Sequence, residues 1–247
     1  MRGFCQLTWV ELKLVLREPM LGIFTVVFPL MMLFVFGGVY GNKPSDYFGG
    51  YGMVDVSVPA WTGLIIATTG FLSLAISVAT YRERGVLRRL RLTPVRPQAI
   101  LGAQIAVLLF MNGMGMCLLV IAAKLLFGLR FQGNILSVAG GFALGSLSIF
   151  AIGFFLAGIA PSARAAQAIG MILFYPMIFL SGATIPLEAM TGAIRQYAKV
   201  LPLTHVVTLL RGLWIGDSWG QHLTEVAVLS GVLVVGVALS AWVFRWE

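Results

Sequence analysis

Six long stretches of this chain carry no charged side chain, and this pattern limits its fold more than any other feature. Each stretch has at least 19 residues and lacks Asp, Glu, Lys, Arg and His. An α-helix needs ~20 apolar residues to cross the ~30 Å hydrocarbon layer of a bilayer. We therefore predict an all-α membrane protein in which a single domain, residues 1–247, contains six transmembrane helices. Approximately, the predicted spans are residues 21–40, 56–80, 97–123, 135–160, 165–186 and 224–244.

The composition agrees with a membrane as the surrounding solvent. Of the 247 residues, 59% are hydrophobic and 11% are charged, whereas a soluble domain has about 25% charged residues. The first apolar stretch, residues 21–40, is longer than the ~7–15 residues of a cleaved signal's apolar region. We therefore expect this stretch to remain in the chain as a membrane anchor.

The distribution of Lys and Arg predicts the orientation in the membrane. With six spans, 11 of the 17 basic residues lie on the side that carries both termini. Loops rich in Lys and Arg stay in the cytoplasm, so we expect both termini to be cytoplasmic. The basic residues that fix the topology also account for most of the net charge of +8. The positive charge therefore does not indicate nucleic-acid binding, and we expect no nucleic-acid partner.

One loop, residues 81–96, concentrates much of this charge in the sequence YRERGVLRRLRLTPVR. It contains six arginines and one acid, Glu83. If residues 82–92 form a helix, Arg84, Arg88 and Arg91 share one face, and the Thr93–Pro94 pair ends the helix. Such a helix suits a groove on another protein, and it equally suits anionic lipid head groups.

Two further segments outside the spans have helical spacing. Before the first span, Phe4, Leu7, Val10 and Leu14 lie beside a polar stripe that includes Lys13. This pattern predicts a short helix in the cytoplasmic interface, although a simple basic flank would look similar. Between the fifth and sixth spans, residues 188–225 carry charges and two prolines, and we predict two short external helices that dip into the outer leaflet.

Small residues in the fourth span predict close helix contacts. Gly141 and Gly145 form a G-x-x-x-G motif, and Gly153 and Ala157 repeat the spacing further along. Small side chains let helix backbones approach closely in lipid.

The sequence lacks the chemistry of several functional classes. The six apolar stretches contain no ionisable group of the kind that an ion-coupled carrier uses to hold a proton or cation. His205 and His222 lie outside the predicted spans. None of the lysines follows a glycine, so the chain has no phosphate-binding P-loop. We therefore predict no catalytic, metal or cofactor site, and any pumping requires energy from another polypeptide.

Two segments resemble type-2 ATP-binding-cassette exporter permeases of the drug-resistance kind. YRERGVLRRLRLTPVRPQAILGAQI, residues 81–105, resembles the loop after their second span, and LPLTHVVTLLRGLW, residues 201–214, resembles the segment before their last span. SGATIPLEAM, at the end of the fifth apolar stretch, also fits the family. The chain departs from the family pattern at Gly85-Val86-Leu87, where Gly-Thr-Leu is common, and it has one acid before this glycine instead of two.

The resemblance implies a complex of two permeases, which we expect to be identical copies, with two ATPase subunits that bind ATP and Mg. It implies a prokaryotic plasma (inner) membrane, a coupling helix after the second span and an elbow helix before the first. The residues that it places against the ATPase are Glu83, Arg84, Gly85, Arg88, Arg91, Thr93 and Arg164. The elbow residues are Trp9, Lys13 and Arg17.

The sequence is therefore interpreted as a permease subunit that moves a drug- or lipid-type substrate outward. The path would follow a dimer interface lined by the second and fifth spans, with Phe174, Pro176, Phe179 and Leu180 as pathway or gate residues. Export of a lipid-linked polysaccharide remains an alternative, as does a membrane scaffold or sensor without transport. A channel is disfavoured because no ring of charged or carbonyl-rich filter residues is visible.

Overall fold

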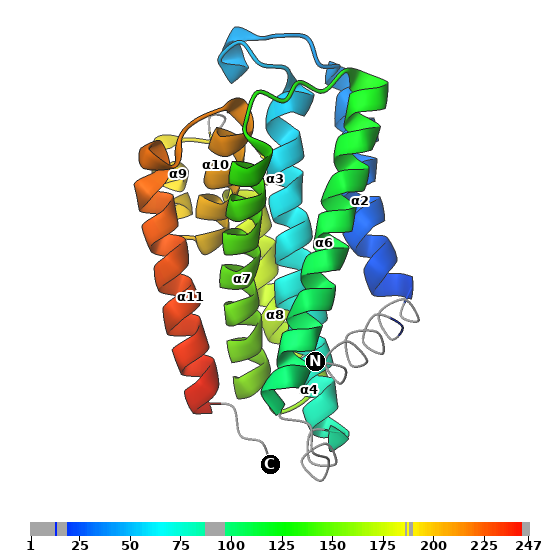
Figure 1. Cartoon of the computed structure of the whole chain (residues 1–247), viewed down its shortest axis with the longest axis vertical. Helices are drawn as coiled ribbons and strands as arrows, with labels where there is room; N and C mark the ends of the chain where they lie inside the picture. The colour runs from blue at the N-terminus through cyan, green and yellow to red at the C-terminus, as the bar shows by residue number, and fades with distance from the viewer. Residues whose placement is uncertain (1–12, 14–18, 87–96, 186, 188–189, 244–247) are drawn as a thin grey trace.

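The structure, a computed structural model, describes residues 13, 19–86, 97–185, 187 and 190–243 (Figure 1). Within these residues the regular elements are all helical. The long helices are α2 (Pro19–Tyr40), α3 (Met53–Thr68), α6 (Pro97–Phe127), α7 (Ile135–Ile159), α8 (Ala163–Leu180) and α11 (Leu223–Val243). The shorter elements are η1 (Asp46–Phe48), η2 (Thr69–Leu74), α4 (Ala75–Glu83), α9 (Gly192–Ala198), α10 (Pro202–Ile215) and η4 (Trp219–His222).

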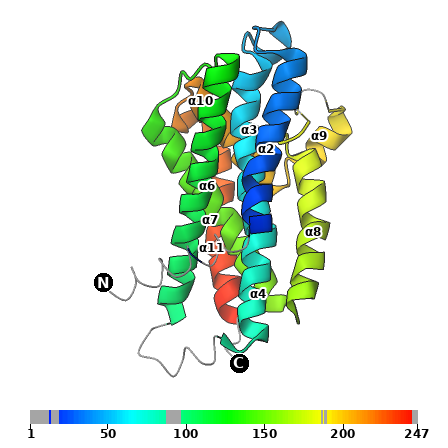
Figure 2. The same cartoon turned by 90° about the vertical axis from the view of Figure 1, so that its right-hand side faces the viewer.

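The long helices run along one another and define two ends of a bundle (Figures 1 and 2). We name these ends after residues of the second span: α3 starts at the Asp55 end, and α4 finishes at the Glu83 end. α6 and α8 start at the Glu83 end, whereas α7 and α11 start at the Asp55 end. The predicted spans therefore coincide with helices of alternating direction, as a multi-pass membrane protein requires.

Among the described residues, five helices are long and apolar enough to cross a membrane. They are Met53–Glu83, Leu101–Phe127, Ile135–Ile159, Ala163–Leu180 and Trp219–Val243. The first predicted span is the 22-residue helix α2, of which Val26–Tyr40 qualifies as a shorter apolar helix. The chain is thus an integral membrane protein by the length and composition of its helices.

The second span is the central helix of the bundle. It combines α3, the π-helix η2 and α4 into a continuous helical segment that packs against α2, α6, α7, α8 and α10. Its apolar part is 72% buried within the chain, against 28% for α8 and 11% for α11. Most of the second span is therefore unavailable to lipid or to another subunit.

Glycines bring two neighbouring helices onto the π-helix η2. A Cβ atom at Gly153 of α7 would collide with the carbonyl oxygen of Gly70, and one at Gly170 of α8 would collide with that of Phe71. Such contacts are backbone to backbone, as small residues in membrane helices permit. The predicted close contact at Gly153 is therefore present, and its partner is the second span.

The segment between the fifth and sixth spans forms two helices, α9 and α10, with a bend of 95° between them. The prediction of two short helices instead of one continuous span is therefore confirmed. The helix α10 packs against α3, α7 and α11 and buries most of its length, and its predicted depth in the outer leaflet stays a prediction. The glycines of the G-x-x-x-G motif explain this burial, because Gly141 leaves room for Leu213 and Gly145 leaves room for Val206.

The predicted elbow helix falls almost entirely outside the described residues. Lys13 is helical and exposed. Trp9 and Arg17 lie outside the described residues, and their roles stay predictions.

Candidate functional site

The second span ends with a glycine cap at the Glu83 end. α4 finishes at Glu83, and Gly85 adopts a left-handed conformation with φ of 65°. The N–H of Gly85 donates to the carbonyl oxygen of Arg82 at 3.0 Å, and the N–H of Arg84 donates to that of Thr80 at 2.9 Å. Glycine is favoured here because it adopts positive φ without steric cost.

This cap lies at the start of the predicted coupling helix, most of which falls outside the described residues and stays a prediction. A continuous helix over residues 82–92 is wrong at its beginning, because the chain turns at Arg84 and Gly85. Arg84 therefore does not continue the helical face predicted for Arg88 and Arg91. These two arginines and Thr93 lie outside the described residues.

Arg82 binds the end of the fourth span. Its guanidinium group donates to the carbonyl oxygens of Ala157 at 3.0 Å and of Gly158 at 2.9 Å, and also to that of Ala160. The last carbonyls of a helix lack partners within the helix and carry a partial negative charge. Arg82 therefore acts as a side-chain cap on the C-terminus of α7.

Glu83, the next residue, binds the start of the fifth span. Its Oε2 atom accepts a hydrogen bond from the backbone N–H of Ala163 at 3.0 Å. Ser162 completes the cap, because its hydroxyl oxygen accepts from the N–H of Ala165 at 3.2 Å. A carboxylate is favoured at this position because helix N-termini carry a partial positive charge.

Arg82 and Glu83 together form a pair that we call the Arg82–Glu83 clamp. The cation contacts the negative end of α7, and the anion contacts the positive end of α8. The clamp therefore joins the second span to the turn between the fourth and fifth spans. Glu83 was predicted as an ATPase contact, and the internal role of Arg82 and Glu83 was not predicted from the sequence.

The predicted ATPase contacts that the structure describes gather at one corner of the bundle. Arg84 follows the clamp directly, and Arg164 follows Ala163, the residue that Glu83 binds. Both arginines and Glu83 are exposed, and Gly85 is half-buried. This corner can present two guanidinium groups and one carboxylate to a partner.

The fifth span presents an exposed apolar face. Ile172 is 70% exposed, Tyr175 53% and Phe179 51%. Figure 2 shows α8 on the side of the bundle away from α6. Side chains with this exposure are available to lipid or to another subunit.

The four predicted pathway residues do not all lie on this face. Pro176 and Phe179 are exposed, and Leu180 is half-buried. Phe174 is only 8% exposed, and its ring lies edge-on to that of Tyr175 with a centroid distance of 5.6 Å. Ile172 was not predicted as a pathway residue, although its spacing from Tyr175 and Phe179 places it on the exposed side.

The second span adds a narrow stripe beside α8. η2 and α4 both pack against α8. Their buried surface is interrupted by half-exposed side chains at helical spacing, namely Thr68, Leu72, Ile76 and Thr80. The second and fifth spans therefore offer neighbouring surfaces, as the predicted interface requires, with α8 contributing the larger share.

A buried carboxylate organises the Asp55 end. Asp55 is 1% exposed and accepts hydrogen bonds from the side-chain amide of Asn42 at 2.8 Å, the N–H of Arg130 at 2.8 Å and the N–H of Gly52 at 3.1 Å. It thereby ties the segment after α2 and the segment after α6 to the start of α3. Asp55 lies just before the predicted second span, residues 56–80, so this link was not predicted.

A polar pair lies inside the bundle, between the second and third spans. The hydroxyl of Thr69, in η2, lies 2.7 Å from Oδ1 of Asn112 in α6 and 2.9 Å from the carbonyl oxygen of Ile65. Both side chains are buried. Counting charges did not reveal this pair, because neither residue is ionisable.

Metal chemistry has no support in the described part of the chain. No group of three or more His, Cys, Asp or Glu side chains in those residues is placed to hold a metal ion.

These features define the class of protein as an integral membrane protein built from apolar helices. Residues 2–214 match the family described as "ABC-2 type transporter", so the chain belongs to this family. The family predicted from the loop and the segment before the last span is therefore confirmed.

The chain is similar to several named permeases. It is 29% identical over 185 residues to the inner membrane transport permease YhhJ of Escherichia coli (strain K12). The aligned region covers 69% of this chain and 49% of YhhJ. It is 25% identical over 227 residues to the daunorubicin resistance ABC transporter permease protein DrrB1 of Streptomyces coeruleorubidus, with 89% of this chain and 76% of DrrB1 covered. The chain therefore spans about half the length of YhhJ and most of DrrB1.

Proposed function

We propose that this chain is the transmembrane subunit of an ATP-driven exporter that moves an amphipathic or hydrophobic substrate outward. The observation that carries the proposal is the exposed face of α8, with Ile172, Tyr175 and Phe179, beside the half-exposed stripe of the second span. A surface of this kind suits contact with a second copy of the chain and with a drug- or lipid-type substrate. Membership of the ABC-2 family and the names of its relatives agree with this proposal.

The energy would come from a separate ATP-binding-cassette ATPase that holds ATP and Mg. We place this partner at the Glu83 end, where Arg84 and Arg164 are exposed, together with the loop residues Arg88, Arg91 and Thr93. The Glu83 end and both termini would then face the cytoplasm of a prokaryotic cell. The working unit would contain two copies of the chain and two ATPase subunits, without nucleic acid.

Docking is tested by co-purification with the ATPase and by hydrolysis with and without substrate in lipid vesicles. Glu83→Gln keeps an oxygen that can accept from Ala163 but removes the charge, and Arg88→Ala removes one loop cation. We expect both variants to insert and dimerise but to show weaker ATPase association or weaker substrate-stimulated hydrolysis, by roughly 10- to 100-fold if a charged contact is lost. If both variants behave like the parent protein, the loop is a topology signal and the docking site is wrong.

The exposed face of α8 is tested separately by truncating Ile172. The matched control is Leu125→Ala, because Leu125 of α6 is also an exposed aliphatic residue, at 78% against 70% for Ile172. We expect Ile172→Ala to reduce dimer cross-linking and transport, while Leu125→Ala leaves both unchanged. Equal effects of the two changes would contradict an interface at α8.

Export of a lipid-linked polysaccharide is the second candidate function. The observation that favours it is the aromatic character of the α8 face, because Tyr175 and Phe179 are both exposed and aromatic rings suit sugar surfaces. The two candidates are distinguished by which compound stimulates hydrolysis in vesicles. A drug-like amphiphile supports the first, and a lipid-linked glycan supports the second.

A further inference from the structure

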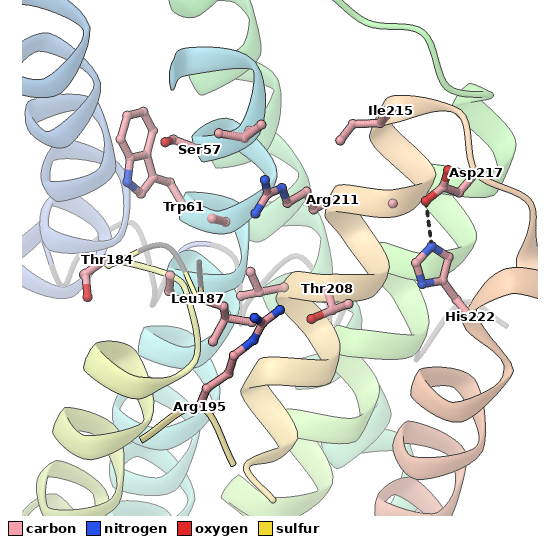
Figure 3. Close-up of a pocket in the computed structure, with 16 residues that line it drawn as sticks. Ser57, Trp61, Thr184, Leu187, Arg195, Thr208, Arg211, Ile215, Asp217 and His222 are labelled. Atoms are coloured by element: carbon pink, nitrogen blue, oxygen red, sulfur yellow. Dashed lines mark hydrogen bonds and ion pairs between the residues drawn. The ribbon is translucent and has the colours of Figure 1, made fainter. Parts of the chain in front are cut away.

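Two hollows of the structure differ in the chemistry of their walls. The cavity shown in Figure 3, of about 270 Å³ at the Asp55 end, is lined in part by charged and hydroxyl side chains. Its carboxylate, Asp217, lies 3.1 Å from Nε2 of His222. The other hollow, of about 380 Å³, lies between α7 and α11 and is lined by apolar residues alone. We call this second hollow the α7–α11 groove.

The α7–α11 groove lies within the membrane-spanning part of the chain. Ile152 and Phe155 of α7 form one wall, and residues between Val228 and Leu239 of α11 form the other. The two helices pack side by side (Figure 1). Because an α-helix rises about 1.5 Å per residue, the groove begins ~8 Å after the start of α11 and extends for ~16 Å along it. Its walls therefore lie in the hydrocarbon layer and not among the head groups.

Hydrogen bonds near both ends of the groove hold its walls together. The hydroxyl oxygen of Ser148 in α7 lies 2.8 Å from the carbonyl oxygen of Leu229, and the hydroxyl of Ser240 in α11 donates to the carbonyl oxygen of Ala151 at 3.3 Å. Between these bonds, a Cβ atom added at Gly236 would collide with Ala151, so the two helices are already in close contact. The helices have no room to close the groove by moving together.

The groove is open on the side that faces away from α7. A Cβ atom added at Gly231 would meet open space, and Val235, one turn further along α11, is 56% exposed. One edge of the groove is Pro202, the first residue of α10. The first N–H groups of a helix lack partners within the helix, but proline has no N–H to leave unpaired. The groove therefore meets α10 at a residue that tolerates contact with hydrocarbon.

The dimensions of the groove distinguish a lipid chain from another helix. A volume of about 380 Å³ over ~16 Å of length gives a cross-section of ~24 Å², which corresponds to a width of ~5–6 Å. A transmembrane helix with its side chains is ~10–12 Å wide and does not enter such a groove. Carbon atoms in contact lie ~3.5–4.0 Å apart, so a single hydrocarbon chain fits this width.

We propose that the α7–α11 groove holds one acyl chain of a membrane phospholipid. Val232 and Val235 contact the chain from α11, and Ile152 and Phe155 contact it from α7. Phospholipid is the source of the chain because the groove opens directly into the hydrocarbon layer of the membrane. The residues that line the groove include none from α8, so this site is separate from the exposed face of α8 and does not depend on the proposed export.

The binding test places the full chain in phospholipid vesicles that contain a trace of phospholipid with a photoactivatable diazirine in one acyl chain. After illumination, the labelled residues are located by mass spectrometry. The reference surface is the exposed side of α6, represented by Leu118 and Ile121, which are 43% and 54% exposed. We expect Phe155 and Val232 to be labelled at least ~5-fold more than these two residues, because a groove surrounds a chain with more carbon contacts than a convex helix surface does.

Gly231→Leu fills the groove from its open side without meeting other residues of the chain. Leucine is a better helix former than glycine, so the variant should fold. We expect labelling of the groove to fall by at least ~5-fold, because the leucine side chain takes the space of the lipid chain, while labelling of α6 stays the same. The matched control is Gly113→Leu in α6, where a Cβ atom also meets open space. This control should leave labelling of the groove unchanged.

Three results would overturn the proposal. Equal labelling of the groove and of α6 in the parent protein would show that the groove carries only ordinary boundary lipid. Labelling of the groove that survives Gly231→Leu would place the lipid chain elsewhere. The third result concerns a second copy of the chain as occupant, tested with Val235→Cys after both native cysteines are replaced by serine. A disulfide-linked dimer of this variant would show that protein, and not lipid, covers the groove.

Discussion

Replacing Arg82 with methionine tests whether the Arg82–Glu83 clamp stabilises the protein. The change keeps a flexible side chain of similar length but removes the donors to Ala157, Gly158 and Ala160. A hydrogen bond to a charged group contributes about 1.5–3 kcal/mol, and bonds that share one guanidinium group are not additive. We therefore expect a loss of about 2–3 kcal/mol in the free energy of unfolding.

This loss translates into a measurable change in thermal stability. For chains of ~150–250 residues, 1 kcal/mol corresponds to roughly 2–4 °C in Tm. The Tm of Arg82→Met in detergent should therefore fall by about 4–12 °C, measured by intrinsic tryptophan fluorescence during heating. Orientation in the membrane should persist, because 10 of the 11 basic residues on that side remain.

Arg164→Met is the matched control for this experiment. Arg164 is an exposed arginine in the first turn of α8, at the same end of the bundle. A cation at a helix N-terminus is slightly unfavourable, so its removal should leave Tm unchanged or raise it by a small amount. The reasoning is refuted if Arg82→Met melts at the parent temperature, or if both changes lower Tm equally.

Three further changes test other parts of the structure. Gly153→Ala places a Cβ atom against the backbone of η2, and we expect it to lower the free energy of unfolding by about 1–3 kcal/mol, measured by thermal unfolding. The control is Gly113→Ala, where a Cβ atom meets open space, and it should leave stability unchanged or raise it. Asp55→Asn replaces one carboxylate oxygen, which accepts hydrogen bonds, with an amide nitrogen that donates them, although three donors already surround this side chain. The change should lower Tm by more than Asp46→Asn, which replaces an exposed acid. A cysteine introduced in place of Arg88 should react with membrane-impermeant reagents only after cell lysis, and labelling of intact cells would reject the proposed orientation.

The positions of the long helices follow from the sequence because lipid excludes charged side chains, but their ends do not. α3 begins at Met53, before the predicted start at residue 56, because Asp55 accepts hydrogen bonds from Asn42 and Arg130 of other segments and from the N–H of Gly52, the residue just before the helix. α8 ends at Leu180, before the predicted end at residue 186, where Gly182 adopts a φ of 88°. Both differences depend on local backbone geometry or on distant partners, which counting charges cannot reveal.

The burial of α10 within the bundle was not predicted from the sequence. Arg211 and the neighbouring charges predicted a short helix that dips into the outer leaflet instead of a full span. In the structure, the apolar face of α10 fits over Gly141 and Gly145 of α7 and over Gly63 of α3. The motif was recognised in the sequence, but a small-residue motif does not specify which helix packs on it.

The sequence located the charged loop, yet it could not assign its residues to different tasks. Arg82 binds carbonyl groups 75 to 78 positions away, so its role depends on the fold and not on its neighbours in the chain. The arginines of this loop are alike in chemistry, and only position separates an internal cap such as Arg82 from an exposed residue such as Arg84. A run of like charges therefore predicts topology well and individual contacts poorly.

The Arg82–Glu83 clamp also gives the proposed docking corner a direct connection to the proposed pathway. Arg84 and Arg164 are the exposed neighbours of the clamp, on either side of the contact between Glu83 and Ala163. α8 starts at this contact and carries Tyr175 and Phe179 further along its exposed face. A displacement of the loop by an ATPase would therefore act on the start of α8 through hydrogen bonds that are already formed, and not through a flexible linker. Rigid connection of this kind is what a transporter needs if hydrolysis on one polypeptide is to move helices of another.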